Sequence, residues 1–476
     1  MAEFEQSKSH RYSRWIMASF GAREMFGEWI NGAFGFAVYY FYEAVIGLQI
    51  WMAGLAFILY SIWNAINDPL MGYLMERIHW PWQKKSGMQR FPIIIFGAIT
   101  WLASYLLIFL VPTKWVVDGN QWRIFTWYLV TLCIYDTVLT IYEVNVLALY
   151  PDKFQDSRER RVAQGFGTVL GITGIVLAAL IPPMWVTKEL ESYRTMALLS
   201  VAIGFLLLLI ILPGIYEDKH LREIYKKRNA KITTERKNSF FKTAKLVFSN
   251  RNFVGKIVFH FGYYMSATFL QTSAFYVLVF LLNRPETDLI LLMAPMLTGA
   301  ILSTPIWALI ANKVDNNKNV IMVAGILMTL SFLPLIFVNT IIGWMIGLFF
   351  FGIALGGQWF MDPPTFADVL DDAAVKTGFH QHSVYIGYQT FIVRFAGAFQ
   401  AIIFSVVHIL TTFPEGVNTL EEFLIKSENP SLAVFGIRLH ATIIPAIVIL
   451  ITLFVFWNLY TLTPEKVKEN KSILAQ

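Results

Sequence analysis

Residues 50–75 of the chain read IWMAGLAFILYSIWNAINDPLMGYLM, an apolar run in which Asp68 is the only charged residue. A helix needs about 20 mostly apolar residues to cross the hydrocarbon core of a bilayer. The run is long enough for that, and it places one carboxylate inside the membrane. It therefore predicts a transmembrane helix whose buried carboxylate has a structural or functional role.

Eleven other runs of the same kind lie along the chain. They cover residues 27–46, 92–112, 123–149, 162–187, 194–213, 254–282, 287–311, 319–338, 341–368, 385–412 and 433–462. The stretch between the sixth and seventh runs of the chain is polar and rich in charge. We therefore predict an all-α membrane protein with 12 transmembrane helices, in two six-helix halves, 1–213 and 252–476, joined by a cytoplasmic linker, 214–251.

Composition supports a membrane protein. Of 476 residues, 56% are hydrophobic and 15% are charged, whereas soluble domains have about 45–50% apolar and about 25% charged residues. A single cysteine, Cys133, excludes an intramolecular disulfide and a cysteine-rich metal site. The net charge of +6 does not indicate nucleic acid, because the basic residues form short blocks between apolar runs.

These basic blocks also predict the orientation. If both termini are cytoplasmic, the inner segments hold 29 of the 38 Lys and Arg residues and the outer loops hold seven. Cytoplasmic segments of membrane proteins carry the excess of Lys and Arg. We therefore expect an N-in, C-in topology.

An internal repeat supports the two halves. Residues 67–72 read NDPLMG in the second run, and 303–308 read STPIWA at the corresponding place in the eighth. Glu143 in the fourth run has a counterpart in Asp362 of the tenth. Two similar six-helix halves, with a solute site near mid-membrane, are typical of major-facilitator transporters, so we predict this fold. Glycine pairs 343/347 and 352/356 predict close helix packing.

Ionisable groups inside the spans are the candidate functional residues, because a charge near the bilayer centre costs several kcal/mol unless it faces a partner or a cavity. They are Glu28, Asp68, Asp136, Glu143, Asp362 and Arg394. Asn64 and Asp68 share a helix face, as do Asp136, Thr140 and Glu143. Oxygen ligands of this kind fit a hard monovalent cation or a proton, and Arg394 is expected to pair with a carboxylate of the other half.

The same residues have a structural interpretation. In this interpretation, a buried carboxylate has no role beyond a structural ion pair with Arg394. Asp68 would accept hydrogen bonds from backbone groups that Pro69 leaves without a partner in the helix. Glu76, Arg77, Asp152 and Asp371 lie near predicted cytoplasmic ends, where gating or structural salt bridges are expected. His380 and His382 lie in a polar inner loop, where we expect a solvated pair rather than a metal site.

No enzyme signature accompanies these features. The chain contains no GxxxxGK[ST], HExxH, GxSxG or CxxC sequence. We therefore predict that it is not an enzyme, has no cofactor, binds no metal beyond a monovalent coupling cation, and is not an ATP-driven pump.

Several motifs, spread over nearly the whole chain, resemble the glycoside–pentoside–hexuronide cation symporters of the major facilitator superfamily, the family of the melibiose permease. The matching stretches are residues 39–48, 62–72, 158–160, 367–378 and 388–394. The resemblance implies a coupling-cation site at Asn64, Asp68 and Thr140. It places the family's sugar-binding acids at Glu28 and Glu143 and its span-11 cation at Arg394, and we expect all three to bind solute, together with Asp136 and Asp362. From their positions near the cytoplasmic ends, we expect gating or structural salt bridges at Glu76, Arg77, Asp368 and Asp371.

Three positions depart from the family pattern. Asn64 stands where sodium-coupled members have a second aspartate, so the coupling ion can be Na⁺ or H⁺. Thr168 and Leu147 replace an arginine and a tryptophan that contact sugar in the family.

The expected function is cation-coupled symport of a small polar solute, a sugar or glycoside, by alternating access. The resemblance implies a location in the plasma membrane. We expect a monomer in contact with membrane lipid. The alternative is a cation-coupled lysophospholipid or lipid transporter, favoured by the missing arginine at Thr168 and by 40 phenylalanines. A receptor without transport activity is a third class, which the clustered charges disfavour.

Overall fold

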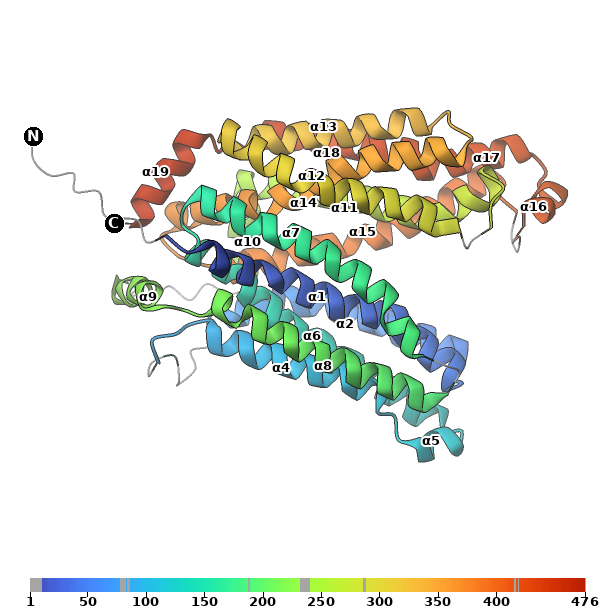
Figure 1. The fold of residues 1–476 in the computed structure, drawn as a ribbon, viewed down its shortest axis with the longest axis horizontal. Helices are drawn as coiled ribbons and strands as arrows, with labels where there is room; N and C mark the ends of the chain where they lie inside the picture. The colour runs from blue at the N-terminus through green and yellow to red at the C-terminus, as the bar shows by residue number, and fades with distance from the viewer. Residues whose placement is uncertain are drawn as a thin grey trace, which may run out of the picture. The chain divides into compact units, whose positions relative to one another are not determined.

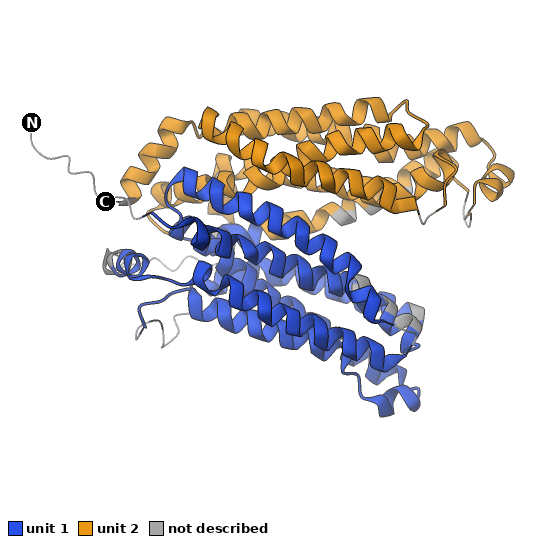
Figure 2. Cartoon of the chain, viewed as in Figure 1, with its two compact units in different colours: residues 1–240, 381–388 blue, residues 241–380, 389–476 orange. Residues whose placement is uncertain are grey.

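The computed structural model describes residues 11–77, 83, 86–186, 189–231, 240–285, 288–414, 417 and 419–475, and every regular element among them is a helix (Figure 1). The chain divides into two compact units (Figure 2). Unit 1 comprises Met1–Phe240 with Gln381–Tyr388, and unit 2 comprises Phe241–His380 with Gln389–Gln476.

Unit 1 is built from six long helices. They are α1 (Arg14–Tyr40), which continues as the π-helical turn η1 (Phe41–Val45), α2 (Ile50–Met75), α4 (Phe91–Phe109), α6 (Gln121–Lys153), α7 (Ser157–Leu180) and α8 (Leu190–Ile215). Shorter elements are α5 (Thr113–Val117), η2 (Pro182–Trp185) and α9 (Lys219–Lys231).

Unit 2 repeats this plan. Its long elements are α11 (Arg251–Tyr276) with η3 (Val277–Leu281), α12 (Leu289–Val314), α13 (Asn317–Leu335), α14 (Ile341–Thr377), α15 (His382–Leu410), and α17 (Pro430–Arg438) continuing through η5 (Leu439–Ile443) into α18 (Ile444–Leu459). Shorter helices are α10 (Phe240–Ser249), α16 (Leu420–Lys426) and α19 (Pro464–Ala475). The first residues of α10 and α15 are counted with unit 1.

Within the described part of the chain, nine helices are long and apolar enough to cross a membrane. They correspond to the third to sixth, seventh to tenth, and twelfth predicted spans. Helices α1, α2 and α15 lie at the predicted positions of spans 1, 2 and 11 and have 27, 26 and 29 residues. That these three also cross the bilayer, and that both termini are cytoplasmic, stay predictions.

Helix ends differ from the predicted ends because capping, rather than hydrophobicity, terminates a helix. Helix α1 begins 13 residues before the predicted span, where the Ser13 side chain accepts a hydrogen bond from the Ile16 amide. Helix α14 runs past residue 368 to Thr377 and ends at Gly378, whose φ of 74° is in the left-handed region. The predicted linker contains α9 and α10.

Glycine brings α1 and α7 into close contact in unit 1. A methyl group built on Gly174 would lie 2.8 Å from the Met25 carbonyl oxygen and 3.1 Å from Glu28 Cβ. One built on Gly171 would lie 3.1 Å from Glu24 Cβ. The backbone of α7 therefore supports the turn of α1 that carries both glutamates.

The second of the two predicted glycine pairs packs α14 against α12 in unit 2. A methyl group on Gly356 would lie 2.6 Å from the Ala300 carbonyl oxygen and 2.8 Å from Ser303 Oγ, and Gly352 meets the Met296 carbonyl in the same way. Close packing is confirmed for this pair.

Gly356→Ala is expected to destabilise the protein by about 1–3 kcal/mol, because the added methyl group overlaps backbone that cannot move independently. A lowered melting temperature of the purified protein in detergent checks this. The control is Gly54→Ala in α2, where a methyl group meets nothing within 4 Å. Since alanine favours a helix over glycine by about 1 kcal/mol, the control should melt no lower than the parent, and equal melting of both variants would contradict the packing argument.

Candidate cation and solute sites

Helices α2 and α6 form a buried polar cluster in unit 1. Asn67 donates through Nδ2 to Asp136 Oδ2 at 2.9 Å and to Thr140 Oγ1 at 3.0 Å. Thr140 donates to Asp68 Oδ1 at 2.9 Å. All four side chains are buried, so the cluster places two carboxylates on one hydrogen-bonded framework.

Asparagine oxygens at this cluster are available to a cation. Asn64, Asn67 and Asp68 share one face of α2, at spacings of three and four residues. The Oδ1 atoms of Asn64 and Asn67 are buried, and neither has a hydrogen-bond partner in the part of the chain that the structure describes. An unsatisfied buried acceptor costs about 1–3 kcal/mol, which a bound cation would relieve. The donors are all oxygens, as Na⁺ requires.

The structure modifies the predicted cation site. Asp68 and Thr140 are in direct contact, as their predicted shared role requires, and Asn64 lies one helical turn before Asp68. Asp136, which we expected on the solute side, belongs to this cluster instead. Asn67 was not predicted, although its spacing of three residues from Asn64 was a usable signal.

The predicted solute-binding glutamates are half-buried on α1 and α6. Glu28 lies against the glycine row of α7. One turn earlier on α1, Glu24 forms an unpredicted ion pair with Arg23 at 2.7 Å, and Arg23 also donates to Gln164 Oε1 at 3.2 Å. Glu143 lies one turn beyond Thr140 on α6. Solute binding by Glu28 and Glu143 stays a prediction.

Unit 2 contains its own buried polar cluster. Lys256 of α11 lies 3.0 Å and 3.1 Å from the two carboxylate oxygens of Asp362 on α14, and it donates to Gln389 Oε1 on α15 at 2.7 Å. His260 Nδ1 lies 2.7 Å from Asp362 Oδ1 and 3.2 Å from the Tyr263 hydroxyl. Asp362 is thus held by a lysine and a histidine of its own unit.

Asp362 therefore has its ion-pair partners, Lys256 and His260, within unit 2. Arg394 lies on α15, where its side chain is exposed. Neither Lys256 nor His260 was among the predicted site residues. Solute binding by Arg394 and Asp362 stays a prediction.

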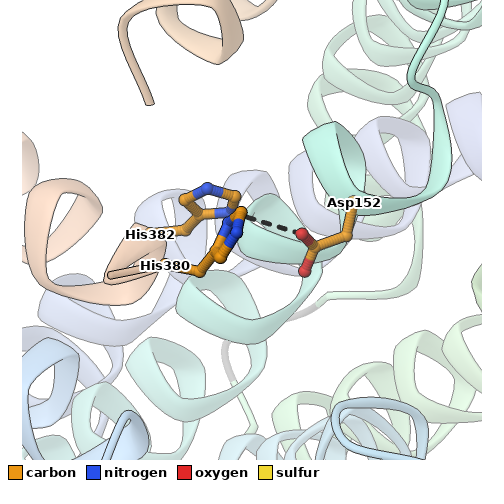
Figure 3. A group of neighbouring side chains, drawn as sticks. All are labelled: Asp152, His380 and His382. Carbon is orange, nitrogen blue, oxygen red and sulfur yellow. Dashed lines mark ion pairs between the residues drawn. The ribbon is translucent and has the colours of Figure 1, made fainter. Parts of the chain in front are cut away.

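A third cluster joins the ends of α2, α4 and α6 to the start of α15 within unit 1. The Arg90 guanidinium lies 3.3 Å from Glu76 and 3.5 Å from Asp152, and it donates to Ser383 Oγ at 3.0 Å. Glu76 also accepts from the Ser383 amide at 2.9 Å. His382 Nδ1 lies 3.6 Å from Asp152 Oδ1. Figure 3 draws this ion pair as a dashed line. The first turn of α15 is thereby anchored to unit 1.

This cluster corrects one expectation. His382 is buried beside Asp152 rather than solvated, because α15 begins against the ends of α4 and α6. Glu76 uses Arg90 as its cation, while the neighbouring Arg77 lies over the Tyr73 ring at 4.2 Å. Figure 3 also draws His380, which is counted with unit 2.

Predicted gating aspartates on α14 lie at the end of unit 2 where α19 packs. Asp368 accepts from Asn317 Nδ2 at 2.7 Å and lies 3.8 Å from Lys471 Nζ of α19. Asp371 is buried beside it on α14. These contacts fit a structural or gating role, which stays a prediction.

Glu217 ties the start of α4 to the segment after α8. Its carboxylate accepts from the Gln89 amide at 2.7 Å and from the Arg90 amide at 2.8 Å. The side chain is fully buried. Burial raises the pKa of Glu217 from 4.5 to about 7, although the Arg90 and Gln89 amides and the Arg90 charge act in the opposite direction.

Glu217 should make stability depend on pH. A carboxyl group with a raised pKa contributes stability that is fully present below its unfolded value of 4.5 and is lost as the pH rises through about 7. The shift corresponds to roughly 3 kcal/mol. In melting curves between acid and mildly alkaline pH, the parent should lose stability relative to Glu217→Gln as the pH rises. Glu428→Gln, at an exposed position, is the control, and parallel pH profiles for the parent and Glu217→Gln would contradict the assignment.

The chain is similar in sequence to known transport proteins over most of its length. The chain matches the family described as MFS/sugar transport protein over residues 19–463. It is similar to the sodium-dependent lysophosphatidylcholine symporter 1 of Xenopus tropicalis, with 24% identity over 87% of this chain and 80% of that protein. The Gallus gallus protein of the same name is 24% identical over 93% of this chain and 85% of that protein.

A solved structure supports the fold. The crystal structure of the Escherichia coli fucose:proton symporter superposes with a TM-score of 0.62 and 12% identity, covering 94% of this chain and 98% of that one. The family match confirms the predicted superfamily, while the glycoside–pentoside–hexuronide branch stays a prediction. Because the family match spans nearly the entire sequence, the chain belongs to the family of MFS/sugar transport proteins.

Proposed function

We propose that the protein is a cation-coupled symporter whose solute is a lysophospholipid. The observation that carries the proposal is the similarity, over 87% and 93% of this chain, to proteins named sodium-dependent lysophosphatidylcholine symporters. This similarity favours a lysophospholipid or another lipid over a sugar as the solute.

The α2–α6 cluster supports sodium as the coupling ion. Asn64 removes one carboxylate from the predicted site, but Asp136 brings a second one within the hydrogen-bonded cluster of Asp68 and Thr140. The number of carboxylates tunes the affinity of an oxygen-ligand site for a hard cation. Two carboxylates with two open asparagine oxygens are a stronger sodium site than the sequence indicated.

The position of the family's sugar-binding arginine supports a solute other than sugar. Thr168 occupies it, is buried on α7, and donates to the Gln164 carbonyl oxygen at 3.0 Å. Its hydroxyl hydrogen is thus used within its own helix and cannot also be donated to a sugar hydroxyl.

In unit 1, we assign recognition of the quaternary amine of the headgroup to Glu28 and Glu143. In unit 2, the planar Arg394 guanidinium suits a phosphate group. A lysophosphatidylcholine headgroup carries both charges. Occupation of the cation and headgroup sites would favour the alternating-access step, and we place the protein in the plasma membrane with both termini inside.

Uptake into proteoliposomes tests this function. Radiolabelled lysophosphatidylcholine is supplied under an inward sodium gradient, an inward proton gradient, or neither. Lipid inserted into the outer leaflet is removed with albumin before counting, and protein-free vesicles give the background. Albumin-resistant uptake that requires sodium is expected. Accumulation of radiolabelled melibiose without lysophosphatidylcholine uptake would overturn the lipid proposal in favour of a sugar.

A further inference from the structure

The cluster around His260 has a feature that a sodium site does not need. His260 Nδ1 is surrounded by Asp362 Oδ1 at 2.7 Å, the Tyr263 hydroxyl at 3.2 Å and Lys256 Nζ at 3.3 Å. A ring nitrogen carries at most one hydrogen. The short contact with a carboxylate fixes that hydrogen on Nδ1, donated to Asp362.

The other charged groups of the cluster, Lys256 and Asp362, are already paired with each other. Lys256 donates to Asp362 and to Gln389 Oε1. The lysine and the aspartate neutralise each other, so the imidazole is neutral in this arrangement. Lys256 is almost fully buried, at 1% exposure of its side chain, and is unavailable to a ligand.

His260 Nε2 takes part in none of these bonds. The His260 side chain is 14% exposed, so the outer edge of its ring is not sealed. The stacked Tyr264 ring also faces it from α11. Helix α18, which packs on α11, has no titratable side chain in its sequence. The groups that face His260 are thus Lys256, Tyr263 and Tyr264 of α11, Asp362 of α14, and the neutral Gln389 beside Lys256.

We propose that His260 is a proton-binding site in unit 2, separate from the cation site of unit 1. Its protonation controls the hydrogen bond between Lys256 of α11 and Gln389 of α15. The geometry is that of a histidine anchored through one nitrogen to a carboxylate and open at the other. A carboxylate partner fixes the tautomer and the orientation of the ring.

The step is a simple protonation. A proton from water bonds to the Nε2 lone pair, and the imidazolium keeps its Nδ1–H bond to Asp362. Two positive groups, His260 and Lys256, then share one carboxylate, with Nδ1 and Nζ 3.3 Å apart. Their repulsion weakens the Lys256–Asp362 pair and changes the Lys256–Gln389 bond by which α11 holds α15. Loss of the proton to water restores the original arrangement.

The test has a spectroscopic and a transport readout, and only the transport readout rests on the proposed function. Purified protein labelled with [¹³Cε1]histidine is titrated by NMR from about pH 5.5 to about 8.5, the range in which histidine changes charge in proteins. One resonance that is missing from His260→Gln should titrate in the parent. His220→Gln, at an exposed position on α9, should remove a different resonance.

In vesicles, lysophosphatidylcholine uptake is measured at saturating sodium over the same pH range. The parent should show one ionisation limb, with the rate changing by up to about tenfold per pH unit. His260→Gln should lose the limb, and His220→Gln should keep it.

The two failures are distinguishable. A titrating His260 resonance without any uptake would overturn the lipid symporter and leave the proton site standing. A pH-independent parent with normal uptake would overturn the proton site without need of a variant. A limb that persists in folded His260→Gln, or a His260 resonance that does not titrate, would identify the cluster as a neutral structural element.

Discussion

Replacing Asp68 by asparagine is expected to abolish sodium-driven uptake and to leave the fold intact. The asparagine has the same shape, and its Oδ1 can still accept the hydrogen bond from Thr140. The substitution removes one of the two carboxylate charges of the buried cluster. The other oxygen atoms that could bind the cation are neutral. Loss of this charge should weaken sodium binding on the order of 100-fold.

Two measurements check the Asp68 prediction. Uptake of lysophosphatidylcholine under a sodium gradient reports coupling, and the sodium dependence of tryptophan fluorescence reports binding without transport. Asp315→Asn is the matched control, because Asp315 is exposed and in a left-handed backbone conformation that asparagine tolerates. Unchanged sodium dependence in a folded Asp68→Asn protein would show that Asp68 has no coupling role.

Hydrophobic runs were sufficient to locate the helices, because each span must bury about 20 apolar residues in lipid. They could not locate the helix ends. Ser13 and Gly378 terminate α1 and α14 through local hydrogen bonding and a left-handed turn, well outside the apolar runs. The two units likewise follow from the repeat, but nothing in the sequence indicated that residues 381–388 pack with unit 1.

The candidate sites were predictable where charge and spacing coincide on one helix. Asp68 stood out as a charge within an apolar run. Asn67 and His260 carry no obligatory charge, so the cost of burying an ion gave no signal for them. The Lys256–Asp362 pair joins residues 106 apart in sequence, and a helical period cannot reveal such a contact. The sequence therefore identified the buried carboxylates of both clusters, but not the residues that pair with them.

Removing the carboxylate of Asp362 is expected to be the most destabilising single change in unit 2. In Asp362→Leu, the Lys256 ammonium remains buried with the neutral Gln389 and His260 around it. Breaking a buried ion pair in this way costs about 3–5 kcal/mol, because an uncompensated charge stays in a medium of low polarity. The variant should melt far below the parent in detergent, or fail to accumulate as folded protein.

The double variant Lys256→Met/Asp362→Leu distinguishes this cause from simple loss of packing. With both charges replaced by apolar groups, no ion remains to be desolvated, and most of the lost stability should return. Lys466→Met is the control for an exposed pair, since Lys466 lies 2.9 Å from Glu469 and the two side chains are 44% and 54% exposed. Its cost should stay below about 1 kcal/mol. A double variant that melts as low as Asp362→Leu would show that the shapes of the two side chains, rather than their charges, hold α11 and α14 together.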